Sequence, residues 1–292
     1  MRGRTVVVTG ASNGLGLASA VALARAGADL VLPVRDAGRG AAALATVREQ
    51  APGVTARTVD LDLADLASVR RCADGLLDNE SSVDVLLNNA GVMMPPQRRT
   101  TVDGFELQMG TNHLGHFALT LRLLPLLLTT PGSRVVTVSS IAARGGTVDL
   151  DDLHAERSYS PSARYGASKL ANLLFTLELQ RRLDGTQAGT VAVAAHPGIS
   201  ATNLVSTMGI GRLAERLASV LSQSAEAGAG PQLHAATADG VQGGDYYGPR
   251  GPFELRGPTV GRATLPPNAL DTRTAAALWT RSEELTGAFS TV

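Results

Sequence analysis

Two kinds of apolar segment alternate along this chain of 292 residues, and the alternation restricts the fold more than any other feature. Short runs that are apolar at nearly every position predict strands buried on both faces, which is typical of parallel sheets. Longer runs with apolar residues at helical spacing lie between them. The expected strands cover residues 5–9, 29–34, 54–61, 83–91, 133–140 and 190–198, and the expected helices cover residues 16–28, 40–49, 68–77, 105–128 and 165–183. The pattern predicts an α/β protein with a doubly wound parallel sheet.

The C-terminal part departs from this alternation. Residues 243–267 are rich in glycine and proline, which predicts an excursion or a loop, and a capped helix is expected to open at Asp271. No linker-like composition and no internal repeat divides the chain. We therefore expect a single domain over residues 1–292.

Charge and cysteine content exclude several classes of function. The 26 basic residues balance the 26 acidic ones, so nothing favours nucleic acid or an anionic membrane surface as a partner. Cys72 is the one cysteine, which excludes an internal disulfide and a cysteine metal cluster and is typical of a reducing compartment. The first residues lead directly into an apolar strand, and the longest apolar run, residues 121–128, is too short to span a bilayer. The sequence predicts a cytoplasmic protein without a membrane segment or a metal site.

A glycine-rich turn follows the first expected strand. Gly10, Gly14 and Gly16 lie between that strand and the next helix. Glycine there lets the backbone approach a pyrophosphate, which the helix N-terminus stabilises. The spacing is G-x-x-x-G-x-G rather than the commoner G-x-G-x-x-G. The position after the first strand favours a dinucleotide site of Rossmann type over a turn without a ligand.

Small and polar residues also end three later strands. The segments are NNAG at residues 88–91, SS at residues 139–140 and HPG at residues 196–198. In an open parallel sheet, ligands bind beyond the carboxyl ends of the strands, so these segments are expected to line one crevice. An Asn-Gly turn without function is the alternative for the first segment taken alone.

The placement of lysine is unusual. The chain has 26 Lys and Arg residues, of which Lys169 is the one lysine, and it lies four residues after Tyr165. Residues four apart share a helix face, so an ammonium there can favour ionisation of a phenol whose ordinary pKa is about 10. A solvated surface pair is the alternative interpretation.

Taken together, the motifs resemble those of the short-chain dehydrogenase/reductase family. TGASNGLG, DLADL, NNAG, TNHLGHF, VSS, YGASK and HPGISAT occur in the order of that family, from Thr5 to about Thr202. Ser140 and Tyr165 are 25 positions apart, and this insertion is similar to the retinol dehydrogenase and protochlorophyllide reductase-like branch.

The resemblance implies four catalytic residues. Tyr165 would be the general acid or base, and Ser140, rather than Ser139, would bind the substrate oxygen. Lys169 would hold the nicotinamide ribose and lower the pKa of the tyrosine. Asn112 would position a water that relays protons to Lys169.

The resemblance also implies a set of cofactor-binding residues. They are Gly10, Ser12, Asn13, Gly14, Leu15, Gly16, Arg35, Asp62, Leu63, Asn89, Ala90, Gly91, Tyr165, Lys169, Pro197, Gly198, Ile199 and Thr202. Gly198 would permit close approach to the nicotinamide, while DLADL would contact the adenine. A helix cap at Asp65 is the alternative reading of that last segment.

The choice between NADP and NAD depends on the end of the second strand. Asp36 lies about 20 residues beyond the glycines, where a carboxylate would favour NAD. The family register instead places Arg35 where an arginine would bind the 2′-phosphate of NADP. We follow the register, because the sheet fixes the strand length, and expect NADP(H), with NAD(H) as the alternative.

The sequence thus predicts an NADP(H)-dependent oxidoreductase that interconverts a carbonyl and an alcohol on an apolar small molecule. A non-catalytic NAD(P)-sensing protein on the same fold is the alternative. Residues 203–230 would cap the substrate pocket, and the helices at 105–128 and 165–183 would pair subunits in a homodimer or homotetramer. His113 and His116 are expected to be structural, and His196 to be packed or orienting.

Overall fold

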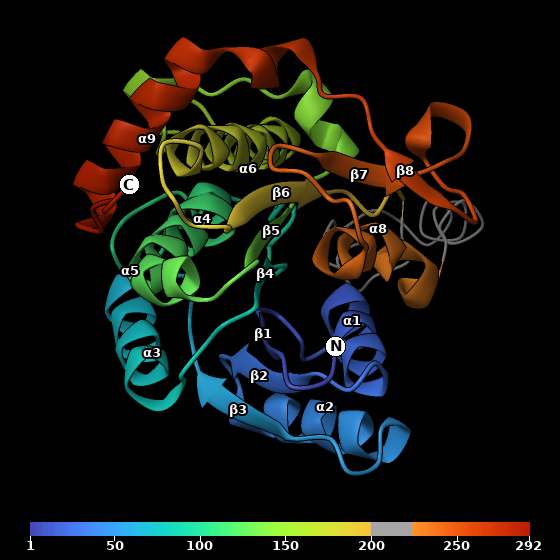
Figure 1. Ribbon diagram of the computed structural model, residues 1–292. Helices are drawn as coiled ribbons and strands as arrows, with labels where there is room; N and C mark the ends of the chain where they lie inside the picture. The colour runs from blue at the N-terminus through green and yellow to red at the C-terminus, as the bar shows by residue number, and fades with distance from the viewer. Residues whose placement is uncertain (200–223) are drawn as a thin grey trace.

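An eight-stranded sheet runs through the computed structural model, which describes residues 1–199 and 224–292 (Figure 1). The strand order is β3-β2-β1-β4-β5-β6-β7-β8, and the described pairings are parallel except for β7 with β8. The strands are β1 Thr5–Val8, β2 Asp29–Val34, β3 Ala56–Asp60, β4 Val85–Asn88, β5 Arg134–Val138, β6 Val191–Ala195, β7 Tyr246–Pro249 and β8 Val260–Arg262. The order reverses between β1 and β4, which makes a crevice at their carboxyl ends the expected ligand site.

Helices cover both faces of the sheet (Figure 1). One face carries α1 Gly14–Arg25, α2 Ala37–Gln50 and α8 Ala225–Thr237, and the other carries α3 Leu66–Asn79, α5 Gly115–Thr129 and α6 Pro161–Leu183. The short α4 Leu107–Met109 and a π-helical turn at Gly110–Leu114 lead into α5. The last helix, α9 Thr272–Thr286, lies outside α6. Within the described residues, no helix has the length and apolar character needed to cross a bilayer.

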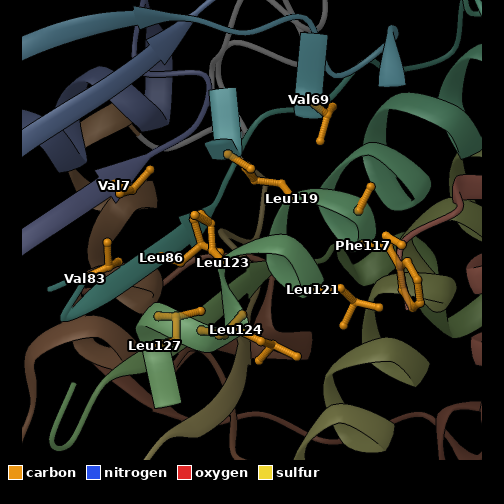
Figure 2. Close-up of a cluster of buried hydrophobic side chains, with 14 of the residues drawn as sticks. Val7, Val69, Val83, Leu86, Phe117, Leu119, Leu121, Leu123, Leu124 and Leu127 are labelled. Carbon is orange, nitrogen blue, oxygen red and sulfur yellow. The ribbon is translucent and has the colours of Figure 1, made fainter. Parts of the chain in front are cut away.

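The central strands are apolar at most positions because alternate residues serve opposite faces. On β1, Val6 and Val8 belong to the core under α1 and α8, while Val7 belongs to the core under α3 and α5. Figure 2 shows the core under α3 and α5, where Leu86 of β4 lies beside Leu123 of α5. Burial on both faces is what the continuous apolar runs predicted.

The structure confirms the expected strands and helices with small shifts of their ends, and it adds two strands. Residues 243–267 were expected to form an excursion or loop, but they contain β7 and β8. Tyr246 and Tyr247 fix β7, because both side chains are buried at the edge of β6. The predicted cap at Asp271 is present, since its carboxylate accepts the backbone N–H groups of Arg273 and Thr274.

The surface expected to pair subunits is partly covered within the chain. Helix α9 packs against α6 and α5, and Trp279 is 2% exposed between Phe117 and Phe175. The exposed large apolar side chains of the described residues lie elsewhere; they are Leu77, Val102, Phe253, Leu270 and Phe289. Helix α9 thus covers part of the surface that these two long helices were expected to use, and subunit pairing stays a prediction.

Candidate active site

The glycine-rich turn is folded tightly between β1 and α1. Gly10 has φ +67°, and a Cβ there would lie 2.8 Å from the Cα of Ala90. A Cβ on Gly16 would lie 2.3 Å from the Gly10 carbonyl oxygen. The turn also carries Ser12, Asn13, Gly14 and Leu15 at the start of α1, where Asn13 is the N-cap residue. Backbone N–H groups at this helix end, at the switch point of the sheet, fit a pyrophosphate.

The NNAG segment is tied to this turn rather than forming an independent turn. The Thr9 hydroxyl oxygen accepts the N–H groups of Asn89 and Ala90 at 2.9 and 3.0 Å. The Asn89 amide donates to the Thr9 carbonyl at 2.8 Å and accepts from Gln232 of α8 at 3.1 Å. The sequence did not point to Gln232, because this contact joins residues 143 positions apart.

Ser140, Tyr165 and Lys169 come together beyond the end of β5. A side-chain hydrogen bond joins Ser140 to Tyr165, and the Lys169 Nζ lies 5.8 Å from the centre of the tyrosine ring. The Ser139 hydroxyl is buried and donates to the Lys169 carbonyl at 2.7 Å. The Lys169 ammonium is 4% exposed and donates to the Val138 carbonyl at 3.0 Å. The arrangement agrees with the choice of Ser140 over Ser139.

Burial dominates the electrostatics of Tyr165. Burial raises the pKa of the Tyr165 phenol above its usual value, and the Ser140 hydrogen bond only partly opposes this. Burial also lowers the pKa of Lys169 to about 8. Burial and the Ser140 hydrogen bond are the causes that set the direction of the tyrosine pKa, and the expected lowering by Lys169 stays a prediction. With this raised pKa, Tyr165 is protonated at neutral pH.

Asn112 lies in the π-helical turn and fixes the segment after NNAG. Its side-chain oxygen accepts the Val92 N–H at 2.8 Å, and its amide donates to the Val92 carbonyl at 3.0 Å and to Ser168 Oγ at 2.9 Å. A Cβ on Gly91 would lie 3.1 Å from Asn112 Oδ1 and 3.5 Å from Lys169 Nζ. The π-turn thus places Asn112 next to Lys169, and such turns are frequent at functional sites.

His116 has a structural role, as expected from the sequence, and it joins two segments of the site. Its Nδ1 donates to the Asn112 carbonyl at 3.0 Å, and its Nε2 lies 2.9 Å from the Thr9 hydroxyl oxygen. Burial lowers the pKa of the ring to about 4, so it is neutral and its Nε2 accepts from Thr9. His116 therefore connects Asn112 to the glycine-rich turn. The four-residue spacing from Asn112 in TNHLGHF is the signal that could have indicated this.

His113 is structural, as expected. Its ring packs near Phe117 and Phe175, and its Nε2 lies 3.0 Å from Ser282 Oγ of α9. Burial lowers the pKa of this ring to about 3, which keeps it neutral in the core.

The end of β2 carries the two residues that bear on cofactor choice. The Asp36 carboxylate caps α2 by accepting the Arg39 N–H at 2.8 Å, and this bond lowers the pKa of Asp36. Arg35 is exposed directly beyond the strand. The Asp36 carboxylate is thus used to cap α2, while Arg35 is exposed at the carboxyl end of β2.

The DLADL segment, at the end of β3, is held by local contacts. Asp62 accepts the Ala64 N–H at 2.9 Å, and the Leu63 carbonyl lies 2.4 Å from the position of a Cβ on Gly115 of α5. Asp65 caps α3 by accepting the Ala67 N–H at 2.9 Å, which confirms the capping role. Asp62 and Leu63 lie at the same edge of the sheet as Arg35, as a shared adenosine site requires.

The loop after β6 packs against the C-terminal excursion. Gly198 has φ +67°, and a Cβ there would lie 2.3 Å from the Leu255 carbonyl oxygen. The Ile199 N–H donates to the same oxygen at 2.7 Å. The sequence led us to expect a glycine here so that the nicotinamide could come close. In the structure, the group that lies close to Gly198 is the Leu255 carbonyl. Pro197 lies in the same loop; Thr202 and residues 203–223 of the expected cap lie outside the described residues.

Comparisons with known proteins identify the family of this chain. The family model described as short chain dehydrogenase matches residues 4–213. Human retinol dehydrogenase 12 is 40% identical over 287 residues, which cover 98% of this chain and 87% of that protein. Mouse polyprenol dehydrogenase is 40% identical over 294 residues, covering 98% and 84% of the two chains.

A solved structure extends the likeness to the whole fold. The crystal structure of an uncharacterised protein from Mycobacterium paratuberculosis is 44% identical, with a TM-score of 0.83 and coverage of 100% of this chain and 96% of that one. The chain therefore belongs to the short-chain dehydrogenase/reductase family, in its retinol dehydrogenase-like branch, and is an oxidoreductase of alcohol or carbonyl groups.

Proposed function

We propose that this protein is an NADP(H)-dependent oxidoreductase that interconverts a carbonyl and an alcohol on an apolar small molecule, with Tyr165 as general acid and base. The observation that carries the proposal is the convergence of Ser140, Tyr165, Lys169 and Asn112 beyond the carboxyl ends of β4 and β5. Two hydroxyls that share a hydrogen bond, with a buried ammonium near the ring of one of them, suit proton transfer to a carbonyl oxygen.

Each of these side chains has a defined task in the proposed reaction. Ser140 and Tyr165 share a hydrogen bond, so a substrate oxygen can bind to both hydroxyls. A protonated Tyr165 can give its proton to that oxygen, while a bound NADPH supplies the hydride. Lys169 uses one of its three donors on Val138, and the other two suit ribose hydroxyls. Because burial raises the pKa of Tyr165, the phenol is protonated near neutral pH, as a general acid in the carbonyl-reducing direction must be.

Three features of the chain fit a dinucleotide with a 2′-phosphate. The glycine-rich turn offers backbone N–H groups to the pyrophosphate, and Gly91 leaves room beside Lys169. Arg35 is exposed at the end of β2, where a planar guanidinium would bind a phosphate with two hydrogen bonds. Asp36 is already bonded to the start of α2 and is less suited to a ribose.

The substrate class is inferred from relatives. The names of two relatives specify retinol and polyprenol, both largely apolar alcohols, and the similarity to them covers 98% of this chain. A carbonyl or alcohol attached to an apolar body is therefore the class that we propose.

Turnover with a carbonyl panel tests the proposal directly. Purified protein is mixed with NADPH and with aliphatic aldehydes, ketones, quinones and retinal, and the loss of NADPH absorbance is recorded. Turnover of at least one apolar carbonyl supports the proposal. Tight NADPH binding without turnover across the panel would instead favour an NAD(P)-sensing protein.

The cofactor choice leads to a prediction for Arg35→Ala. A tenfold preference for NADPH corresponds to about 1.4 kcal/mol, so saturating NADPH should raise the melting temperature about 2 °C more than equal NADH. Loss of the Arg35 guanidinium should remove this difference. Differential scanning fluorimetry measures it, with Arg25→Ala on the far end of α1 as the control. A larger shift with NADH in the wild type would contradict the NADP assignment.

A second prediction concerns Lys169→Arg. A guanidinium is bulkier than an ammonium and cannot reach both Val138 and the ribose from a site that is 4% exposed. We expect at least about a 10-fold loss of kcat, or about 1.4 kcal/mol of transition-state stabilisation, in a variant that folds normally by circular dichroism. A wild-type kcat would contradict the role of Lys169.

The same variant tests the pKa of Lys169. Because burial lowers that pKa to about 8, wild-type affinity for NADPH should weaken as pH rises through 8 and the charge is lost. Arginine stays charged, so the variant should lack this dependence. Fluorescence titration from pH 7 to pH 9.5 measures both affinities. Parallel profiles would show that Lys169 does not titrate in this range.

A further inference from the structure

The carboxylate of Glu254 contacts residues from three separate parts of the chain. Its Oε2 lies 2.5 Å from Arg144 Nη2 and 3.3 Å from His196 Nε2. Its Oε1 accepts the Thr264 N–H at 3.0 Å and the Thr264 hydroxyl at 3.1 Å. The second guanidinium nitrogen of Arg144 donates to the Phe253 carbonyl at 3.1 Å. We call Arg144, His196, Glu254 and Thr264 the Glu254 cluster.

The cluster lies between two segments of the candidate active site. Arg144 belongs to the 3-10 turn Ile141–Gly145 that Ser140 caps, and His196 directly precedes the Pro197–Ile199 loop. The residue after Glu254 supplies the carbonyl that accepts the Ile199 N–H. Glu254 therefore comes from the excursion, yet it is bonded to both sides of the site.

The hydrogen bonds of His196 define its tautomer. The Gly198 N–H donates to His196 Nδ1 at 3.2 Å, so Nδ1 carries a lone pair and the ring proton is on Nε2. That Nε2–H donates to Glu254. Burial lowers the pKa of His196 to about 4, so the ring is neutral and this single tautomer satisfies both partners. Without the carboxylate, the other tautomer becomes available, and it cannot accept from Gly198.

The backbone around Glu254 is held in an unfavourable conformation. Phe253 and Glu254 have φ values of +56° and +60°, in the left-handed region that residues with a Cβ disfavour. Such a backbone conformation is disfavoured, so surrounding contacts must stabilise it. The Phe253 side chain is 81% exposed and has little packing to offer. The turn is held by the contacts of the Glu254 carboxylate together with the Phe253 and Leu255 carbonyls, which accept from Arg144 and Ile199.

We propose that Glu254 is a positioning residue of the active site, which fixes the Pro197–Ile199 loop through the His196 tautomer and fixes the Ser140 turn through Arg144. The group that this loop would position is the nicotinamide end of the cofactor, and that part rests on the proposed function. The loop geometry itself does not depend on it.

Hydrogen exchange of the wild type and Glu254→Ala tests the structural step without any activity. The Gly198 and Ile199 amides should exchange at least about 10-fold faster in the variant, because their acceptors are no longer held. Glu254→Gln should restore most of the protection, since its amide oxygen can still accept from His196. Glu80→Ala is the matched control: its ion pair with Arg57 has nearly the same exposure, 17% for Glu80 against 20% for Glu254, at the other end of the sheet.

Steady-state kinetics test the functional step. We expect Glu254→Ala to lower kcat at least about fivefold, with partial recovery in Glu254→Gln and none of this loss in Glu80→Ala. Wild-type exchange rates at Gly198 and Ile199 in Glu254→Ala, or equal acceleration in Glu80→Ala, would overturn the positioning role. Faster exchange with unchanged kcat would overturn its link to catalysis. An inactive wild type would count against the proposed function alone, because the exchange result would still decide the loop geometry.

Discussion

The Tyr165→Phe variant should turn over carbonyl substrates at least about 100-fold more slowly than the wild type, the scale of losing a general acid. The ring remains in place, so folding and NADPH binding should persist. Only the hydroxyl shared with Ser140 is lost, and with it the proton for the substrate oxygen. Stopped-flow or steady-state absorbance of NADPH measures turnover, and NADPH fluorescence measures binding in the same samples.

Tyr247→Phe is the control for this variant. Tyr247 is also buried, and its hydroxyl donates to Asp245 at 2.7 Å at the far edge of the sheet. It should keep near-normal turnover, because it removes a hydroxyl of the same kind outside the site. Near-normal turnover in Tyr165→Phe as well would remove Tyr165 from its proposed role.

The largest effect on stability is expected for Trp279→Ala. The Trp279 ring lies 5.1 Å from that of Phe117 and 5.9 Å from that of Phe175, with the Arg182 guanidinium 4.3 Å from its centre. Removing a fully buried aromatic side chain lowers the free energy of unfolding by about 3–5 kcal/mol. Denaturant titration followed by circular dichroism measures this loss.

Two further substitutions test whether burial decides the size of this loss. Phe289→Ala, at a side chain that is 68% exposed, should change stability by less than about 0.5 kcal/mol. Trp279→Phe should cost less than Trp279→Ala, because the indole N–H makes no hydrogen bond within the described residues. A Trp279→Ala variant as stable as Phe289→Ala would show that α9 contributes little to the fold.

The sequence predicts the parts of this fold that depend on local pattern. Strands buried on both faces appear as continuous apolar runs, and the glycines of the turn are needed wherever a Cβ would collide, as at Gly16. Tyr165 and Lys169 are found from their spacing because one helix carries both. Local rules suffice where the interacting residues are neighbours along the chain.

Other features depend on contacts that local rules do not contain. His116 meets Thr9 across 107 positions, and His196 meets Glu254 across 58. The pKa of Tyr165 likewise depends on burial in the folded chain, whereas the sequence shows only the nearby lysine. The strands β7 and β8 were missed because their glycines and prolines indicate loops, and pairing with the edge of β6 overrides that preference.

The position of α9 has a consequence for how the protein behaves on dilution. Burial by a helix of the same chain is an intramolecular event, so its extent does not depend on how many molecules share the solution. The apolar residues of α5 and α6 thus stay covered at nanomolar as at millimolar concentration. Where a partner subunit covers such residues, dilution dissociates the subunits and exposes these residues. Here α9 supplies this cover to α6, the helix that carries Tyr165, from within the same molecule.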